Sequence, residues 1–113
     1  MNEENIATVE KYLDALRQKD LSLAPFDHDL KFSDPLAGEG SSADSFRAFL
    51  SGFLPGISGV RVIRHVADAE HVATHWEVTG VFGPIPIIQI FRVRDGMIIE
   101  STALYDPRPA IGS

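Results

Sequence analysis

The sequence predicts an α+β fold in which a strongly curved, mixed but mainly antiparallel sheet wraps around helices on one face, giving a cone. Three observations support this class. Two segments with helical periodicity come first, strand-like segments dominate the second half, and Asp95-Gly96 is a strong hairpin signal between two of those strands. The space that such a sheet encloses is the expected ligand site.

The first helix is predicted at residues 3–18. Its apolar residues recur at helical spacing and form one stripe, which consists of Ile6, Val9, Tyr12, Leu13 and Leu16. After the helix, Asp20 is expected to cap a short turn that ends at Pro25. Residues 30–33 alternate between apolar and polar side chains, which predicts a short strand closed by Asp34-Pro35.

The second helix is predicted after a loop at residues 38–42. Ser41 and Asp44 have the spacing of a capping box, and the helix is expected to stop at Pro55-Gly56. Its apolar stripe consists of Phe46, Phe49, Leu50, Phe53 and Leu54. We expect the aromatic residues of this stripe to close the open end of the cone.

Four strands are predicted in the second half of the chain. The first covers residues 60–67 and is expected to place Val60, Val62 and Val66 on one face. The others cover residues 71–82, 85–93 and 97–105. The strand at 85–93 is apolar at nearly every position, so we expect core on one of its faces and a partner subunit on the other.

Length and composition limit the classes of function. The chain has 113 residues and 44% hydrophobic content, which fits one globular domain over residues 1–113. A net charge of -6 argues against nucleic acid or an anionic membrane surface as a partner. Cysteine is absent, which excludes disulfide and thiolate chemistry. No segment has transmembrane length or the plan of a signal peptide, so a cytoplasmic protein is expected.

Three stretches carry a resemblance to a known family. Tyr12 in VEKYLDAL, Asp34 in FSDPL and Gln89 in IIQIFR resemble the corresponding parts of the ketosteroid isomerases. These enzymes belong to the nuclear-transport-factor-2-like superfamily, which also contains the SnoaL-like polyketide cyclases. The element order of almost the whole chain is similar to that superfamily, and this resemblance implies its cone-shaped, cystatin-like α+β barrel.

The resemblance also implies roles for these residues. Asp34 would carry a proton between two carbons of a carbonyl compound, while Tyr12 would donate a hydrogen bond to the enolate oxygen. The isomerases complete this oxyanion hole with a neutral carboxylic acid, where this chain has Gln89, a weaker acid. Leu50 lies near the position of a supporting tyrosine found in some members. These departures predict reduced or redirected catalysis on an apolar or polycyclic carbonyl compound, without a cofactor.

Each of these residues also has a structural interpretation. Asp34 before proline suits a turn, and Tyr12 can lie at the edge of an apolar stripe with its hydroxyl in water. Gln89 can pair inside the protein instead of contacting a ligand. Strand alternation is expected to turn Trp76 and Tyr105 inward together with Gln89. The predicted pocket walls are Phe49, Phe53, Trp76, Ser101, Ala103 and Tyr105.

Two alternative functions stay open. Relatives similar to limonene epoxide hydrolase activate water with two carboxylates and an arginine, but Arg92 and Arg94 fall on the strand face opposite Gln89. The other alternative is a ligand-binding or association domain without chemistry, which would have its cavity filled by side chains and Asp34 exposed.

No metal site is expected. His71 and His75 would lie about 13 Å apart on a strand, and His28 and His65 fall in segments typical of the surface.

The outer face of the strand at 85–93 predicts the oligomeric state. Ile88 and Ile90 point away from Gln89 and would leave a flat apolar patch. Such patches commonly mark interfaces, so a homodimer through this face is expected.

Overall fold

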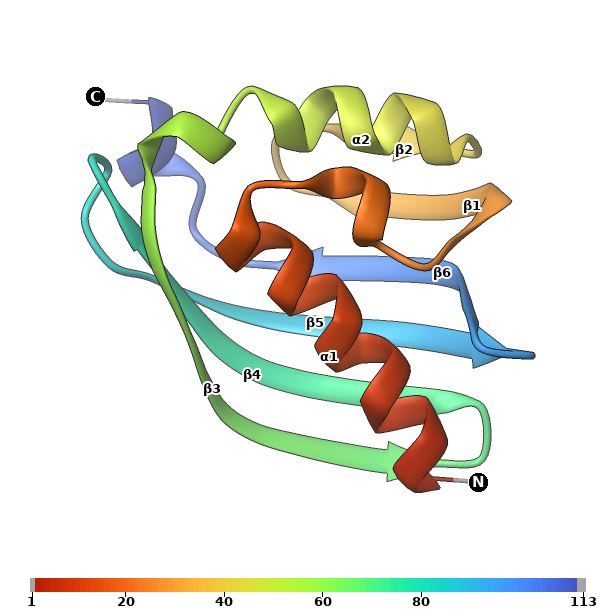
Figure 1. Ribbon diagram of the computed structural model, residues 1–113. Coiled ribbons are helices and arrows are strands. Elements are labelled where there is room, and N and C mark those ends of the chain that lie inside the picture. Colours follow the sequence, from red (N-terminus) through yellow and green to blue (C-terminus); the bar gives the residue numbers. More distant parts are fainter. Residues whose placement is uncertain (1, 112–113) are drawn as a thin grey trace.

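The computed structural model describes residues 2–111, which form a curved six-stranded sheet with two α-helices packed against it (Figure 1). The α-helices are α1 (Asn2–Gln18) and α2 (Ala43–Ser51). The strands are β1 (Phe26–Asp34), β2 (Gly38–Gly40), β3 (Ile57–Asp68), β4 (His71–Gly80), β5 (Ile85–Arg94) and β6 (Met97–Leu104). Short 3-10 helices are η1 (Leu21–Leu23), η2 (Leu54–Gly56) and η3 (Arg108–Ile111).

The sheet is mixed and open. Its strand order is β2-β1-β6-β5-β4-β3, and within residues 2–111 only the β1–β6 pair is parallel. The predicted α+β class with a curved, mainly antiparallel sheet is therefore confirmed. The sheet has two edges, β2 and β3, so it does not close into a barrel.

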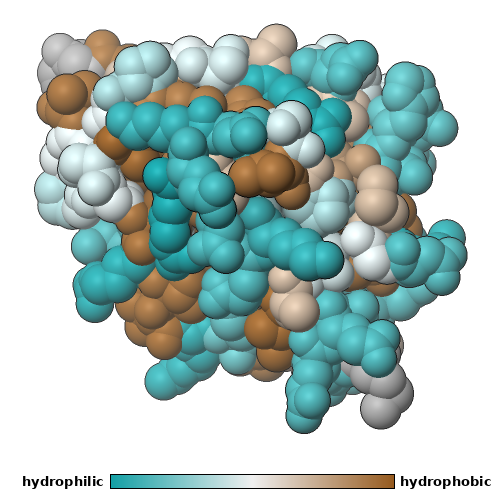
Figure 2. Space-filling view, viewed as in Figure 1, coloured by the Kyte–Doolittle hydropathy of each residue, from teal (hydrophilic) through white to brown (hydrophobic). Residues whose placement is uncertain are grey.

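Helix α1 crosses one face of the sheet (Figure 1). Its apolar stripe is buried in the core. Val9, Tyr12, Leu13 and Leu16 are buried, and Ile6 is half-buried at the start of the stripe. Hydrophilic side chains cover much of the surface where α1 lies in the same view (Figure 2). Because isolated helices of this length are marginal in water, burial of the stripe is what stabilises α1.

The first strand is longer than the sequence predicts. β1 begins at Phe26, because Phe26 and Leu30 both reach the core while the polar residues between them face outward or lie at its margin. β2 lies inside the predicted loop at residues 38–42 and pairs antiparallel with the end of β1, with Asp34 opposite Gly38. This pairing turns the chain back directly after Asp34.

Helix α2 differs from its prediction at both ends. Ser42, not Ser41, is the N-cap residue, and its Oγ accepts a hydrogen bond from the Ser45 N–H at 3.2 Å. The helix stops at Ser51, before Gly52, a poor helix former, and the chain continues into η2. None of the helices within residues 2–111 is long and apolar enough to cross a membrane.

A bulge in β3 reverses the predicted alternation in its second half. The pairing of β3 with β4 shifts register between Val62 and Arg64. Val66 is consequently 60% exposed and does not share a face with Val60 and Val62, so that prediction is wrong. His65 turns inward instead, where its Nδ1 lies 2.8 Å from the Thr74 hydroxyl oxygen and its Nε2 lies 3.3 Å from a Glu10 carboxylate oxygen.

Candidate functional site

A cavity of about 80 Å³ lies between the inner face of the sheet, the helices α1 and α2, and the C-terminal η3. Five of the predicted walls line it, together with all three predicted catalytic residues: Phe49, Phe53, Trp76, Ala103 and Tyr105, with Tyr12, Asp34 and Gln89. Further lining residues that the sequence did not single out as walls include Leu36, Phe46, Phe82, Ile85, Ile87 and Ala110. The cavity is therefore mostly apolar with a few polar groups, as ligand sites commonly are.

Asp34 is at once a turn residue and a cavity residue. Its Oδ1 accepts hydrogen bonds from the N–H groups of Leu36 at 2.8 Å and Ala37 at 3.1 Å, as an Asx turn requires. The same oxygen accepts a third hydrogen bond from the Tyr105 hydroxyl at 2.7 Å. Asp34 is 9% exposed.

The second carboxylate oxygen of Asp34 is the available one. Oδ2 makes no hydrogen bond to any residue between 2 and 111, whereas Oδ1 makes three. No fully buried side-chain oxygen or nitrogen in that range lacks a partner, so Oδ2 keeps some exposed surface, and it belongs to a residue that lines the cavity. One oxygen thus fixes the orientation of the carboxylate while the other can accept a proton.

Tyr12 offers a neutral hydroxyl to the same space. Its ring packs against Phe26 and Phe91, with ring centroids 5.6 and 5.5 Å away. Burial raises the pKa of the Tyr12 phenol far above its usual value, and the adjacent Asp34 charge raises it further, while the neighbouring Gln89 amide lowers it. At neutral pH Tyr12 is consequently a hydrogen-bond donor and carries no charge.

Gln89 is held at both ends of its amide. The Trp76 Nε1–H donates to Gln89 Oε1 at 3.1 Å, and Gln89 Nε2 donates to Ser101 Oγ at 2.8 Å. An indole N–H can only donate, so it must face the amide oxygen, which fixes the orientation of the amide. One N–H of Gln89 is used by Ser101, and the second is left on a residue that lines the cavity.

Ser101 was predicted as a pocket wall, and this prediction needs correction. It is buried and does not line the cavity, because Gln89 lies between them and occupies its hydroxyl. Its role is to hold the Gln89 amide. Strand alternation correctly predicts that Ser101 faces inward. It does not predict which of the inward side chains reach the cavity and which are covered by a neighbour.

Tyr105 has a closer relation to Asp34 than its predicted role as a wall implies. Burial raises the pKa of its phenol far above the usual value, and the hydrogen bond to Asp34 and the Asp34 charge raise it further. Tyr105 therefore stays protonated and keeps donating to the carboxylate. No short-range motif connects the two residues, which are 71 positions apart in the chain.

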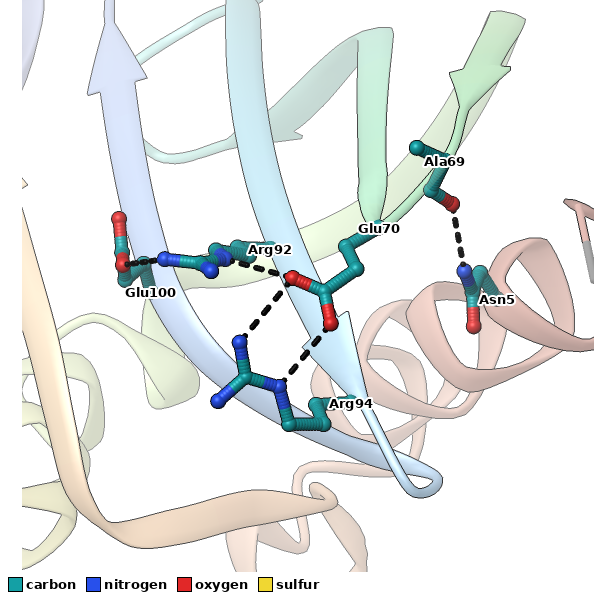
Figure 3. A network of polar contacts seen from close by, with 6 residues as sticks. All are labelled: Asn5, Ala69, Glu70, Arg92, Arg94 and Glu100. Atoms are coloured by element: carbon teal, nitrogen blue, oxygen red, sulfur yellow. Dashed lines mark hydrogen bonds and ion pairs between the residues drawn. The ribbon is translucent and has the colours of Figure 1, made fainter.

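The arginines of β5 lie on the other face of the sheet (Figure 3). Arg92 donates to Glu70 and to Glu100, both at 2.9 Å, and Arg94 donates to Glu70 at 3.0 Å. Hydrogen bonds from Arg94 and Arg92 lower the pKa of Glu70 to about 2. No arginine, lysine or histidine is among the described residues that line the cavity.

Metal-ligating side chains do not converge in the part of the chain that the structure describes. Between residues 2 and 111 no three His, Cys, Asp or Glu side chains lie close enough to hold an ion. The polar side chains among the described lining residues are one carboxylate, two phenols, one amide and one indole.

A curved sheet around α1, closed by α2 over an apolar cavity, is the fold of the nuclear-transport-factor-2-like proteins, and the family match given next confirms the predicted superfamily. Residues 9–101 match the family model for the SnoaL-like domain. The chain belongs to the SnoaL-like family. No match was found among curated protein sequences.

Solved structures agree with this fold. A protein of Kribbella flavida DSM 17836 has a TM-score of 0.85 at 25% identity, with 93% of this chain and 88% of that chain covered. A candidate ketosteroid isomerase of the same organism has a TM-score of 0.79 at 20% identity, with 93% of this chain and 79% of that chain covered. An LEH-like epoxide hydrolase of M. tuberculosis has a TM-score of 0.76 at 21% identity, with 93% of this chain and 84% of that chain covered. Such different neighbours show the fold and leave the reaction to the site.

Proposed function

We propose that the cavity binds a small apolar carbonyl compound and that Asp34 transfers a proton at the carbon next to the carbonyl. The observation that carries this proposal is the asymmetric Asp34 carboxylate, with Oδ1 held by three donors and Oδ2 open to an apolar cavity. A general base needs this combination of fixed orientation and free oxygen.

The reaction needs only groups that line the cavity. Asp34 Oδ2 accepts the proton from the α-carbon, and the electron pair of the broken C–H bond moves into the enolate. Tyr12 donates to the enolate oxygen, with the second N–H of Gln89, which lies next to Tyr12, as a further donor. The protonated Asp34 then returns the proton to the same carbon or to another carbon of the conjugated system. A placed oxyanion donor contributes about 10²- to 10³-fold in rate.

The size of the cavity favours a substrate smaller than a steroid. Its volume is about 80 Å³, whereas a cavity of about 150 Å³ holds benzene. Substrate entry therefore requires the half-buried side chains of the lining to move. Phe53 and Phe82, whose ring centroids are 6.4 Å apart, are the best candidates, since both line the cavity, are half-buried and come from different segments.

Two alternatives use different chemistry. Hydrolysis of an epoxide with two carboxylates and an arginine is disfavoured, because Asp34 is the single carboxylate among the described lining residues and the β5 arginines are engaged elsewhere. A binding domain without chemistry is supported by the internal pairing of Gln89 and by the small cavity. This second alternative is the one that an experiment has to separate from catalysis.

Solvent deuterium exchange tests the proposal directly. Purified protein is incubated in D₂O with cyclopentanone or cyclohex-2-enone, and loss of the α-proton signal is followed by NMR. We expect the wild type to accelerate exchange and Asp34→Asn to lose at least about 100-fold of that acceleration. Asp27→Asn is the matched control, since it makes the same charge change at a half-buried position of β1 that does not line the cavity. Equal exchange in Asp34→Asn and the wild type would leave only a binding domain.

We further propose a homodimer through the outer face of the sheet. Ile88, Ile90 and Leu104 are 40%, 39% and 56% exposed on that face, and Ile88 lies directly opposite Leu104 in the β5–β6 pairing. These exposed apolar side chains lie on neighbouring strands of one face of the sheet, which favours burial against a second copy.

A further inference from the structure

The cavity has an unbalanced charge. Its ionisable lining residues are Asp34, Tyr12 and Tyr105, and the pKa values of both phenols are raised by burial and by the Asp34 charge. Among the described residues no cation lines the cavity, and Asp34 forms no ion pair with any residue between 2 and 111. The cavity therefore contains one carboxylate without a counter-charge.

The hydrogen bonds to Asp34 do not remove this charge. The donors to Oδ1 are two peptide N–H groups and one neutral phenol. They orient the carboxylate and spread its charge, but Oδ2 still faces the cavity without a protein donor in the described chain. Asp34 is nine-tenths buried, so a ligand that brings a positive charge would supply what the surrounding protein lacks.

The rest of the lining suits the apolar part of such a ligand. Aromatic rings of Tyr12, Phe46, Phe49, Trp76 and Tyr105 line the same cavity as Asp34. The faces of aromatic rings attract organic cations, and aromatic cages combined with a carboxylate recognise ammonium groups. An anionic ligand would instead meet the Asp34 charge in a site with no cation to offset it.

We propose that the cavity binds small organic cations, with an ammonium group against Asp34 Oδ2 and its alkyl substituents against the surrounding rings. This ligand class goes beyond the proposed proton transfer and does not depend on it, because it requires only the charge of Asp34 and the aromatic lining. The two roles use one carboxylate, so a bound cation would also block the base.

Choline and 3,3-dimethylbutan-1-ol are suitable probes, because they have the same shape and differ in the charged nitrogen. Both are larger than benzene, so each requires the same movement of the lining side chains that substrate entry requires. Trp76 is the only tryptophan in the sequence and lines the cavity, so its fluorescence reports occupancy. We expect choline to bind the wild-type protein at least about tenfold more tightly than the neutral alcohol. Equal affinities, or no saturable change with either probe, would overturn the proposal.

The variants identify the group responsible. Asp34→Asn should abolish the preference for choline over the alcohol, while Asp27→Asn, with the same change in net charge, should keep it. A preference that survives in folded Asp34→Asn would also overturn the proposal, and circular dichroism verifies folding. If Asp34→Asn does not fold, the affinity ratio of the wild type decides alone. Cation binding without deuterium exchange would reject the proposed catalysis and support the cation site. Deuterium exchange without cation binding would reject the cation site and support the proposed catalysis.

Discussion

The Tyr105 hydroxyl donates a hydrogen bond of 2.7 Å to Asp34 Oδ1 and thereby joins the end of β6 to the turn after β1. The two strands are parallel neighbours in the sheet, with Ser33 opposite Thr102. Together with the Asx turn, the Tyr105 contact leaves only one oxygen of Asp34 free. The position of the Asp34 carboxylate therefore depends in part on a contact between residues that the β1–β6 pairing brings together.

Asp34→Asn should improve the binding of a phenolate that mimics an enolate. The amide keeps the Asx turn but removes the negative charge that opposes the ligand anion. We expect 4-nitrophenolate to bind about tenfold more tightly to the variant, measured by its absorbance change or by Trp76 fluorescence. Weaker binding in a folded Asp34→Asn protein would mean that the phenolate does not occupy the space next to Asp34.

Tyr12→Phe should have the opposite effect on the same ligand. The hydroxyl of Tyr12 is neutral and lies beside Gln89 on a residue that lines the cavity, so its proton can be donated to an oxyanion. Its removal should weaken 4-nitrophenolate binding by about 10- to 100-fold, the value of a hydrogen bond to a charged group. The free energy of unfolding should change by about 1 kcal/mol or less. Unchanged phenolate affinity would exclude Tyr12 as the oxyanion donor.

The fold could be predicted from the sequence because its main signals are local. The helical stripe of α1 and the hairpin at Asp95-Gly96 need only a few neighbouring residues to be recognised, and both lie where they were predicted. Asp95 and Gly96 both have positive φ, as the tight turn requires. The superfamily resemblance rested on the order of such elements.

The details of the site depend on pairing between distant strands, which alternation alone does not reveal. The register shift near Val62 turns His65 inward and Val66 outward. No residue type near Val62 indicates that the strand contains a bulge. Tyr105 was expected to face inward, but its bond to Asp34 follows from the parallel β1–β6 pair. Gln89 had two equally good interpretations because its partners come from β4 and β6.

Trp76→Phe should destabilise the protein through Gln89. The replacement removes the donor to a buried amide oxygen, which costs about 1–3 kcal/mol, and leaves a small space as well. A double-mutant cycle with Gln89→Met, in which unfolding in urea is monitored by circular dichroism, measures the contribution of the Trp76–Gln89 hydrogen bond to the free energy of unfolding. Gln89→Met should cost less in the Trp76→Phe background than in the wild type, because the amide oxygen is already unpaired there. Strictly additive effects would show that the bond contributes nothing to stability.

The lowered pKa of Glu70 should make the free energy of unfolding depend on pH. Hydrogen bonds from Arg94 and Arg92 lower its folded-state pKa from 4.5 to about 2, so the unfolded chain takes up the proton first as the pH falls. The contribution of Glu70 is therefore complete above about pH 4.5 and disappears as the pH falls towards 2.

Urea midpoints at pH 6 and pH 3 measure this contribution. Glu70→Gln should lower the midpoint at pH 6 and show a smaller loss than the wild type between the two values. Glu39→Gln is the control, since Glu39 is exposed on β2 and pairs with no cation within residues 2–111. An identical pH dependence in Glu70→Gln and the wild type would contradict the prediction.

Ile90→Glu should dissociate the proposed homodimer without abolishing ligand binding in the cavity. Ile90 is 39% exposed on the outer face of β5, between Ala73 of β4 and Thr102 of β6, whereas its neighbour Gln89 faces inward. A carboxylate buried without a partner at an interface is costly, so sedimentation velocity at micromolar concentration should show monomers of the variant and dimers of the wild type. Leu23→Glu, at an exposed apolar position in η1, should remain dimeric, and both variants should retain 4-nitrophenolate binding. A monomeric wild-type protein would disprove the dimer. A dimeric Ile90→Glu protein would move the interface to another surface.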